Sequence, residues 1–308
     1  RPRVRGLEER FESRILPLFQ RRTNEVGELI PELYAHGLAQ GDFDLALRGL
    51  LGDDAPLSAS TVARLKEKWH ADKASWDQRD LSSHDVVYLW IDGVYVKAGL
   101  EKAKACVFVA IAGLRDGSKV LVGLSSGHRE STHSWSDFLR SLKARGMNCP
   151  RVIIGDGNLG IWGAATGIYP DADEQRCWNH RIVNAVDKLP KKLQAAGREL
   201  LKRIPYAKSL EDAESLKKEF QAWCAENEQK DAAKVLDVDW ERMVTFYSYP
   251  SQHWKHLRTS NIVESPFAAL RLRTDAAKRF KKADNAIAVI WKTLLIAEQR
   301  FRSSAPRR

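Results

Sequence analysis

Residues 85–97 read Asp-Val-Val-Tyr-Leu-Trp-Ile-Asp-Gly-Val-Tyr-Val-Lys, a β-branched and aromatic run interrupted by one carboxylate, Asp92. Six consecutive residues, 86–91, carry no charge, which is typical of a strand buried on both faces rather than of an alternating surface strand. A second short apolar run, 151–154, is followed by Gly-Asp156-Gly, so a carboxylate again comes after an apolar run. The first run predicts a central strand, and Asp92 is expected where that strand leaves the core.

The carboxylates at these strand ends have two interpretations. Taken singly, an Asp beside Gly after a strand is most often a turn residue or a helix cap. Taken together, Asp92 and Asp156 predict one shared metal site. A third candidate ligand, Glu264, lies far downstream and precedes a long basic segment that is expected to be helical.

Four blocks of this sequence, in this order, resemble the IS256/Mutator-type DDE transposases. They are Ile-Asp92-Gly-Val-Tyr-Val-Lys, Gly-Asp156-Gly-Asn-Leu-Gly, Asp173-Glu-Gln-Arg-Cys177-Trp-Asn-His180 and Leu-Arg-Thr-Ser-Asn-Ile-Val-Glu264. The resemblance extends from about Pro17 to the final helix. It implies an enzyme that cleaves DNA and transfers strands at the ends of a bacterial insertion sequence.

The expected chemistry follows from the ligand types. Phosphodiester cleavage and transfer commonly use two divalent cations, and hard cations prefer oxygen ligands. We therefore expect Asp92, Asp156 and Glu264 to be catalytic residues and ligands of Mg²⁺, with Mn²⁺ as the alternative ion. Asp92 would bridge both ions, while Asp156 holds one and Glu264 the other. Pro266 fits best at the first position of a helix, so Glu264 is expected just before that helix.

A Cys-x-x-His pair, Cys177 and His180, lies near the end of the fifth expected strand. Its spacing suits half of a zinc site, and His253 with His256 offers a second half. The interpretation that we favour gives Cys177 and His180 a supporting role behind the metal ligands, with His180 orienting a phosphate or an active-site carboxylate.

The order of the expected elements is that of an RNase H-like mixed sheet with α/β architecture. Strands are expected at 85–91, 104–114 and 119–125, then a helix at 134–145 capped by Ser134, a strand at 151–154, a helix at 158–166 and an edge strand at 175–178. Within helix 134–145, the residues expected to face the core are Trp135, Phe138, Leu139 and Leu142. The first and fourth strands are adjacent in this fold, which would bring Asp92 and Asp156 side by side.

The spacing of the carboxylates predicts an inserted subdomain. The segment between Asp156 and Glu264 is longer than a compact sheet needs, and its sequence from 187 to 249 has a helical pattern broken at prolines. The expected parts are a basic helical arm at 1–22, a helix-turn-helix-like DNA-binding domain with its linker at 23–81, a first part of the catalytic core at 82–180, an all-helical insertion at 181–257 and the rest of the core at 258–308.

Basic residues are concentrated at both ends of the chain, whose net charge is +10 over 308 residues. Residues 270–308 hold 11 Lys and Arg against 3 Asp and Glu, and residues 1–22 hold 7 Arg against 3 Glu. This excess favours contact with a polyanion such as DNA, and a solvated charged face is the alternative. A helix at 58–69 is the expected recognition helix. The expected DNA contacts are Arg64, Lys68, Arg271, Arg273, Lys278, Arg279, Lys281 and Lys282.

Cysteine usage and hydropathy predict the compartment. Four scattered cysteines do not form a disulfide framework, and the sequence has neither a membrane-length apolar run nor a signal-peptide pattern. We expect a protein of the bacterial cytoplasm, associated with the nucleoid, and a further segment upstream because the first residue is not Met. A homodimer or larger assembly is expected, because two element ends must meet. The alternatives are a non-catalytic DNA-binding protein of the same fold and an RNase H-like nuclease or resolvase without end joining.

Overall fold

A computed structural model describes residues 59–97, 104–127, 130–157, 160–264, 266, 283–299 and 301. The expected arm at 1–22 and residues 23–58 of the expected helix-turn-helix domain lie outside this range. The same holds for six of the expected DNA contacts, Arg271, Arg273, Lys278, Arg279, Lys281 and Lys282.

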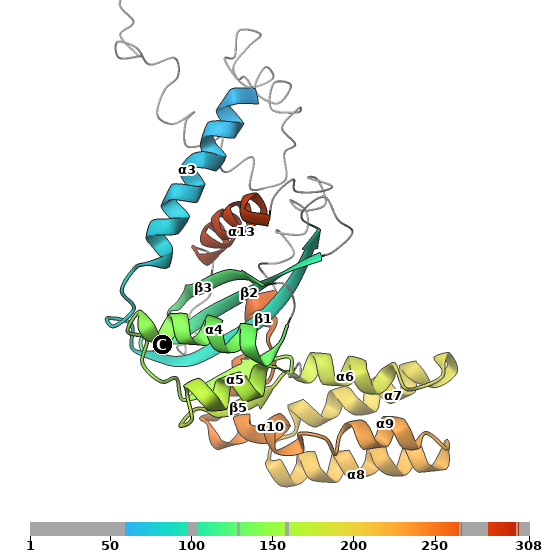
Figure 1. Ribbon diagram of the computed structural model, residues 1–308. Helices are drawn as coiled ribbons and strands as arrows, with labels where there is room; N and C mark the ends of the chain where they lie inside the picture. Colours follow the sequence, from blue (N-terminus) through green and yellow to red (C-terminus); the bar gives the residue numbers. More distant parts are fainter. Residues whose placement is uncertain are drawn as a thin grey trace, which may run out of the picture.

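Within the described residues, five strands form one mixed sheet in the order β3-β2-β1-β4-β5 (Figure 1). They are β1 (Val86–Lys97), β2 (Lys104–Leu114), β3 (Lys119–Gly127), β4 (Val152–Gly155) and β5 (Asp173–Arg176). β1 pairs antiparallel with β2 and parallel with β4, while β5 pairs parallel with β4 at the edge. The predicted adjacency of the first and fourth strands is confirmed, and so is the edge position of the fifth.

Helices cover the sheet on both sides (Figure 1). The longer ones are α3 (Ala59–Asp77), α4 (Thr132–Ala144), α5 (Ile161–Ile168), α6 (Trp178–Val186), α7 (Lys191–Arg203), α8 (Leu210–Glu226) and α13 (Ala283–Glu298). Shorter helices are α9 (Lys230–Val235), α10 (Trp240–Val244) and α11 (Trp254–Leu257). The predicted helical character of 187–249 is confirmed, because no strand occurs there and α7 to α10 fill most of it.

The uncharged run in β1 is explained by burial on both faces of the sheet. Side chains of a strand alternate between its two faces. Leu89 and Ile91 belong to an apolar cluster closed by α4 and α5, whereas Tyr88 and Trp90 belong to a second cluster that includes α6 to α8 and α13. By the same alternation, Asp92 points to the side of Trp90, where the helices downstream of β5 lie.

β1 is longer than predicted, which corrects the expected place of Asp92. The strand continues to Lys97, and Asp92 is paired with Val109 of β2 inside it. The reason is that the residues after Gly93 are again β-branched or aromatic, and β2 offers them hydrogen-bonding partners throughout. The parallel pairing with β4, however, stops at Trp90. Asp92 therefore lies within β1, just beyond the point where its neighbour β4 ends.

The helix predicted at 134–145 begins earlier, at Thr132, and its cap is Ser131 rather than Ser134. The Ser131 hydroxyl accepts a hydrogen bond from the backbone N–H of Ser134 at 3.2 Å, which satisfies one of the free donors of the first turn. The predicted core face of this helix is confirmed, since its buried residues are Trp135, Phe138, Leu139 and Leu142.

The helix predicted at 58–69 extends further, because α3 reaches Asp77. Its last turns pack on the sheet. The Lys73 ammonium donates to the backbone carbonyl of Leu124 in β3 at 3.0 Å, and the Trp76 ring meets Trp291 of α13 edge to face at 6.1 Å. The second half of α3 is therefore held by the same core as the sheet. Arg64 and Lys68 lie nearer its start, and Lys68 is exposed.

Two glycines of the α5 region give a matched stability prediction. A Cβ at Gly160 would lie 2.4 Å from backbone atoms of Ser131 and Thr132, whereas one at Gly167 would meet nothing within 4 Å. Gly160→Ala is expected to lower the free energy of unfolding by about 2–3 kcal/mol, because rigid backbone must move. Gly167→Ala is expected to raise it by about 0.5–1 kcal/mol, because Ala restricts the unfolded chain and favours helix. Urea denaturation of both variants measures the difference, and an equal effect would contradict it.

Candidate active site

The two predicted aspartates come together at the centre of the sheet. Asp92 is only 7% exposed, and its Oδ1 accepts a hydrogen bond from the N–H of Gly93 at 2.8 Å. Asp156 directly follows β4. The parallel register pairs Trp90 with Ile154, and each aspartate comes two residues after its member of this pair. Both carboxylates thus emerge on neighbouring strands at one level of the sheet.

Glu264 joins them from far along the chain, and its local structure corrects the sequence-based expectation. Residues 261–264 are helical, and so is Pro266, so Glu264 lies inside the first turn of a helix and not before it. The helix begins after Ser260, whose carbonyl accepts from the N–H of Val263 and of Glu264. The rule that places a proline at the first helical position therefore does not locate this helix start, because the helix begins five residues before Pro266.

The electrostatics of Asp92 show that the three carboxylates are neighbours. Burial, together with the negative charges of Asp156 and Glu264, raises the pKa of Asp92 to about 7, while His180 opposes the shift. Carboxylates that crowd together in this way favour a bound cation, because each ionised group destabilises the others. Their oxygen donors match the ligands that Mg²⁺ prefers. The residues therefore fit the predicted ion.

Cys177 and His180 lie beside Glu264. Cys177 is fully buried at the start of α6, and the N–H of Ser260 donates to its sulfur at 3.3 Å. Its contact with His180 is the main reason why the pKa of His180 rises to about 9, and Glu264 and Asp92 contribute in the same direction against burial. His180 Nδ1 lies 3.8 Å from Glu264 Oε1. At neutral pH a protonated His180 therefore sits among the carboxylates.

The other half of the predicted zinc site lies elsewhere. His253 Nδ1 is hydrogen-bonded to the hydroxyl of Tyr88 at 2.6 Å, and the backbone carbonyl of His256 accepts from the Trp90 indole. The group of metal-ligating side chains found within the described residues is Cys177, His180 and Glu264, without either of these histidines. The convergence of all four Cys and His side chains is therefore not what the structure shows.

A further carboxylate, Glu130, was missed by the sequence analysis. Its Oε1 occupies the space where a Cβ of Gly93 would be, 2.0 Å away, so its side chain lies over β1 next to Asp92. Cys106 Sγ lies 3.8 Å from the same oxygen. Burial and the charge of Asp156 raise the pKa of Glu130 to about 7. The only signal in the sequence was its place between a strand and a helix, where acidic residues are common for other reasons.

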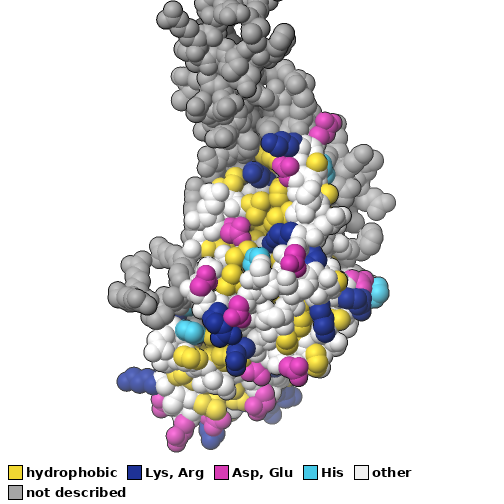
Figure 2. Space-filling view, turned by 90° about the vertical axis from the view of Figure 1, so that its left-hand side faces the viewer, with side chains coloured by type: hydrophobic (Ala, Val, Ile, Leu, Met, Phe, Trp, Pro, Cys, Tyr) yellow, Lys and Arg dark blue, Asp and Glu magenta, His cyan; other side chains and the backbone are white. Residues whose placement is uncertain are grey.

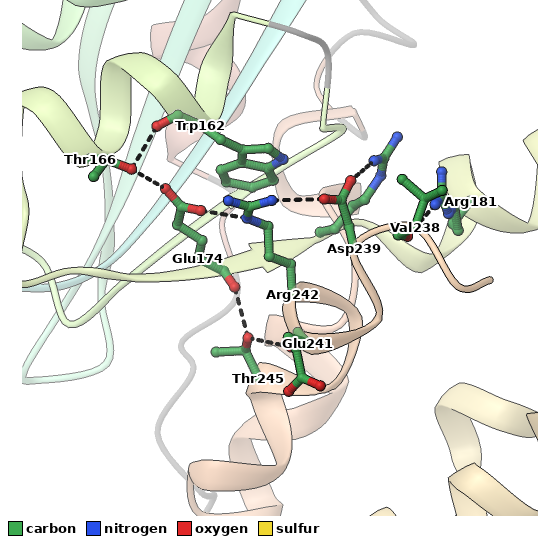
Figure 3. A network of polar contacts seen from close by, with 10 residues as sticks. Trp162, Thr166, Glu174, Arg181, Val238, Asp239, Glu241, Arg242 and Thr245 are labelled. Carbon is green, nitrogen blue, oxygen red and sulfur yellow. Dashed lines mark hydrogen bonds and ion pairs between the residues drawn. The ribbon is translucent and has the colours of Figure 1, made fainter. Parts of the chain in front are cut away.

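A polar network attaches the helical insertion to the sheet edge beside Asp156 (Figure 3). Arg242 of α10 donates to Glu174 of β5 at 2.5 Å and to Asp239 at 2.7 Å, and Arg176 forms an ion pair with Asp239. Arg176 also fills the space above Gly157, where a Cβ would lie 2.5 Å from its Nε. Because Gly157 has a φ of +81° and follows Asp156, this guanidinium packs directly against the loop that carries Asp156.

The Arg176–Asp239 pair gives a second prediction. Arg176→Met removes a guanidinium whose side chain is 10% exposed and leaves Asp239 with Arg242 alone. We expect the free energy of unfolding to fall by about 2–3 kcal/mol, because a largely buried carboxylate loses one of its two cations. Arg115→Met, which breaks an exposed pair with Asp85, is the control and should leave unfolding unchanged. Urea denaturation compares them, and equal losses would contradict a special role for Arg176.

Comparison with known protein families assigns the chain to a class of protein. Residues 2–304 match the family described as "Transposase, Mutator family". The chain belongs to that family of transposases.

Particular relatives agree with this assignment. The chain is 41% identical over 278 residues to the transposase for insertion sequence element IS6120 of Mycolicibacterium smegmatis, covering 90% of this chain and 86% of the relative. It is 35% identical to the transposase for element IST2 of Acidithiobacillus ferrooxidans, with 83% and 87% covered. It is 24% identical to the transposase for IS256 in transposon Tn4001 of Staphylococcus aureus, with 96% and 75% covered. The predicted IS256/Mutator resemblance is therefore confirmed.

Within the described ranges, none of the helices combines the length and the apolar composition that a membrane crossing requires.

Proposed function

We propose that this chain is a DDE-type transposase, which cleaves DNA and transfers the cut strands at the ends of a bacterial insertion sequence. The observation that carries the proposal is the meeting of Asp92, Asp156 and Glu264, three carboxylates from distant segments, where burial and the charges of the other two raise the pKa of Asp92 to about 7. The family membership and the names of the relatives support the reaction class. The mixed sheet, with β4 beside β1, is compatible with the expected RNase H-like core.

In this proposal each residue has a defined task. Asp92, Asp156 and Glu264 would hold Mg²⁺, which when bound activates the attacking oxygen and stabilises the leaving oxygen of a phosphodiester. The Ser260 hydroxyl donates to Glu264 Oε1 at 2.6 Å and orients the carboxylate, and His180 Nδ1 lies 3.8 Å from the same oxygen. The positive charge on His180 would also attract a DNA phosphate toward the carboxylates.

DNA is the proposed partner, and the basic residues concentrated at the two ends of the chain would provide most of the contact. On the face drawn in Figure 2, basic and acidic side chains are interspersed, and this mixture does not resemble a DNA-binding surface. Eleven of the basic residues fall in 270–308, and six of those were predicted as DNA contacts. Two element ends would require two or more copies of the chain, so we include a homodimer or larger assembly in the proposal.

The test uses the full chain and a labelled duplex that carries the element's own terminal sequence. With Mg²⁺ we expect nicking at the terminus and, with a second duplex present, joined products; EDTA should abolish both. Cleavage without joining would identify a nuclease or resolvase instead, and binding without cleavage would identify a non-catalytic DNA-binding protein. A duplex with a scrambled terminus is the control, and equal cleavage of it would contradict the proposal.

A further inference from the structure

We propose that Cys177, His180 and Glu264 form a binding site for a thiophilic divalent cation such as Zn²⁺. This site differs from the oxygen-ligand site of the aspartates, although it shares Glu264 with it. One ligand atom from each of the three residues lies within 4.8 Å of the other two. A thiol, an imidazole and a carboxylate are the three ligand types that zinc takes in proteins.

The backbone brings these ligands together before any ion binds. Cys177 caps α6 and His180 follows one turn later, so the two side chains share a face of the helix start. The segment before Glu264 is tied to that turn, because the N–H of Trp178 donates to the carbonyl of Arg258 at 2.9 Å. The Asn179 and Asn261 side chains add a hydrogen bond at 2.7 Å.

Ser260 supports two of the three ligands, as outer partners do in protein metal sites. Its backbone N–H donates to Cys177 Sγ at 3.3 Å, and its hydroxyl donates to Glu264 Oε1 at 2.6 Å. Ser260 is itself fully buried. Such outer hydrogen bonds fix the orientation of a ligand, and their loss commonly weakens metal affinity about 10–100-fold. A buried serine that serves both a sulfur and a carboxylate is thus well placed for a metal centre.

The geometry favours zinc over magnesium at this position. Zinc–ligand distances of about 2.0–2.3 Å in a tetrahedron place ligand atoms roughly 3.3–3.8 Å apart, so the three atoms need to close by only about 1 Å. Magnesium does not take a thiolate readily. The His180 and Glu264 side chains are 39% and 33% exposed, so solvent reaches one side of the site. An ion can enter there, and a water can complete the fourth position. Metal binding would be favoured by rising pH, because a thiolate and a neutral imidazole are the forms that bind an ion.

The consequence for the reaction rests on the proposed function. A zinc ion bound by Cys177 and His180 would draw Glu264 away from Asp92 and Asp156. Micromolar Zn²⁺ is therefore expected to inhibit Mg²⁺-dependent cleavage. If Cys177→Ser retains cleavage activity, Zn²⁺ is expected to inhibit this variant less than it inhibits the unaltered chain. The binding itself does not depend on this consequence and is tested separately.

Cobalt(II) is the probe, because it replaces zinc and gives a thiolate-to-metal charge-transfer absorption. The reduced full chain is titrated with Co²⁺ alone. We expect one equivalent to bind with this absorption, Zn²⁺ to displace it and excess Mg²⁺ to leave it unchanged. Ser260→Ala should weaken Co²⁺ binding about 10–100-fold. Cys177→Ser should abolish the absorption. Cys149→Ser removes an exposed thiol elsewhere and should change nothing.

Two results would overturn the site. One is the absence of charge-transfer absorption in the unaltered chain, and the other is absorption that survives Cys177→Ser but disappears in Cys149→Ser. If Cys177→Ser fails to fold, the Co²⁺ affinity of His180→Gln, a change at a half-exposed side chain, is measured instead. An affinity equal to that of the unaltered chain would contradict the proposal. Cobalt binding without DNA cleavage would refute only the proposed function. Cleavage without cobalt binding would refute only this site.

Discussion

Asp92→Asn is expected to abolish strand cleavage and strand transfer together while making the metal-free protein more stable. Removing one of three ligands from a metal pair costs several kcal/mol of transition-state stabilisation, and each 1.4 kcal/mol is about tenfold in rate, so the loss should reach at least about 10³-fold. Asn keeps the volume of the side chain at a position that is only 7% exposed. The fold should therefore survive the change.

The stability gain has a defined pH dependence. Because the pKa of Asp92 is raised to about 7 in the folded state, from an ordinary value of 3.8, the carboxyl group favours folding most at low pH. That contribution is lost as the pH rises through about 7, where the buried group must ionise. In EDTA, Asp92→Asn should exceed the unaltered protein in melting temperature by a few degrees at pH 8 and by little at pH 4. An equal gain at both pH values would contradict the raised pKa.

Glu264→Gln is expected to have the second largest effect, a loss of about 10³-fold in cleavage with little change in unfolding. The variant removes the charge that neighbours Asp92 and His180 but keeps the side chain in the first turn of its helix. The Ser260 hydroxyl can still donate to the remaining amide oxygen. Cleavage of a terminal-sequence duplex, with melting temperature measured in parallel, checks both parts.

Glu241→Gln is the matched control for this prediction. Glu241 is an acidic residue of α10 upstream of Glu264, and it is exposed. In Figure 3 its carboxylate points away from the ion pairs of Glu174 and Arg242. Near-normal cleavage by Glu264→Gln together with a dead Glu241→Gln would reverse the assignment.

The sequence predicted the sheet well because its signals are local. The uncharged run before Asp92 and the glycines around Asp156 lie on neighbouring strands, as expected, and the core face of α4 followed from helical spacing. The boundaries were less accurate. The extension of β1 beyond Asp92 depends on β2 as a partner. The start of α4 at Thr132 depends on which serine, Ser131 or Ser134, caps the helix by accepting a hydrogen bond from an N–H of its first turn.

The surroundings of the site could not be predicted, because they depend on contacts between distant segments. Nothing near Glu130 in the sequence indicates that its side chain lies over Gly93. The pairing of Arg176 with Asp239 likewise joins the end of β5 to a residue late in the helical insertion. The place of Glu264 was predicted incorrectly from a local rule about Pro266, although its neighbours Cys177 and His180 were identified.

The order in which the carboxylates occur along the chain has a consequence for synthesis on the ribosome. β1, β2 and β3 form a local meander that can fold early, whereas Glu264 must wait for the whole helical insertion. At roughly 5–20 residues per second, many seconds separate the emergence of Asp92 from that of Glu264. A nascent or prematurely terminated chain would therefore lack Glu264. Under the proposed function, such an incomplete chain would not cleave the host chromosome.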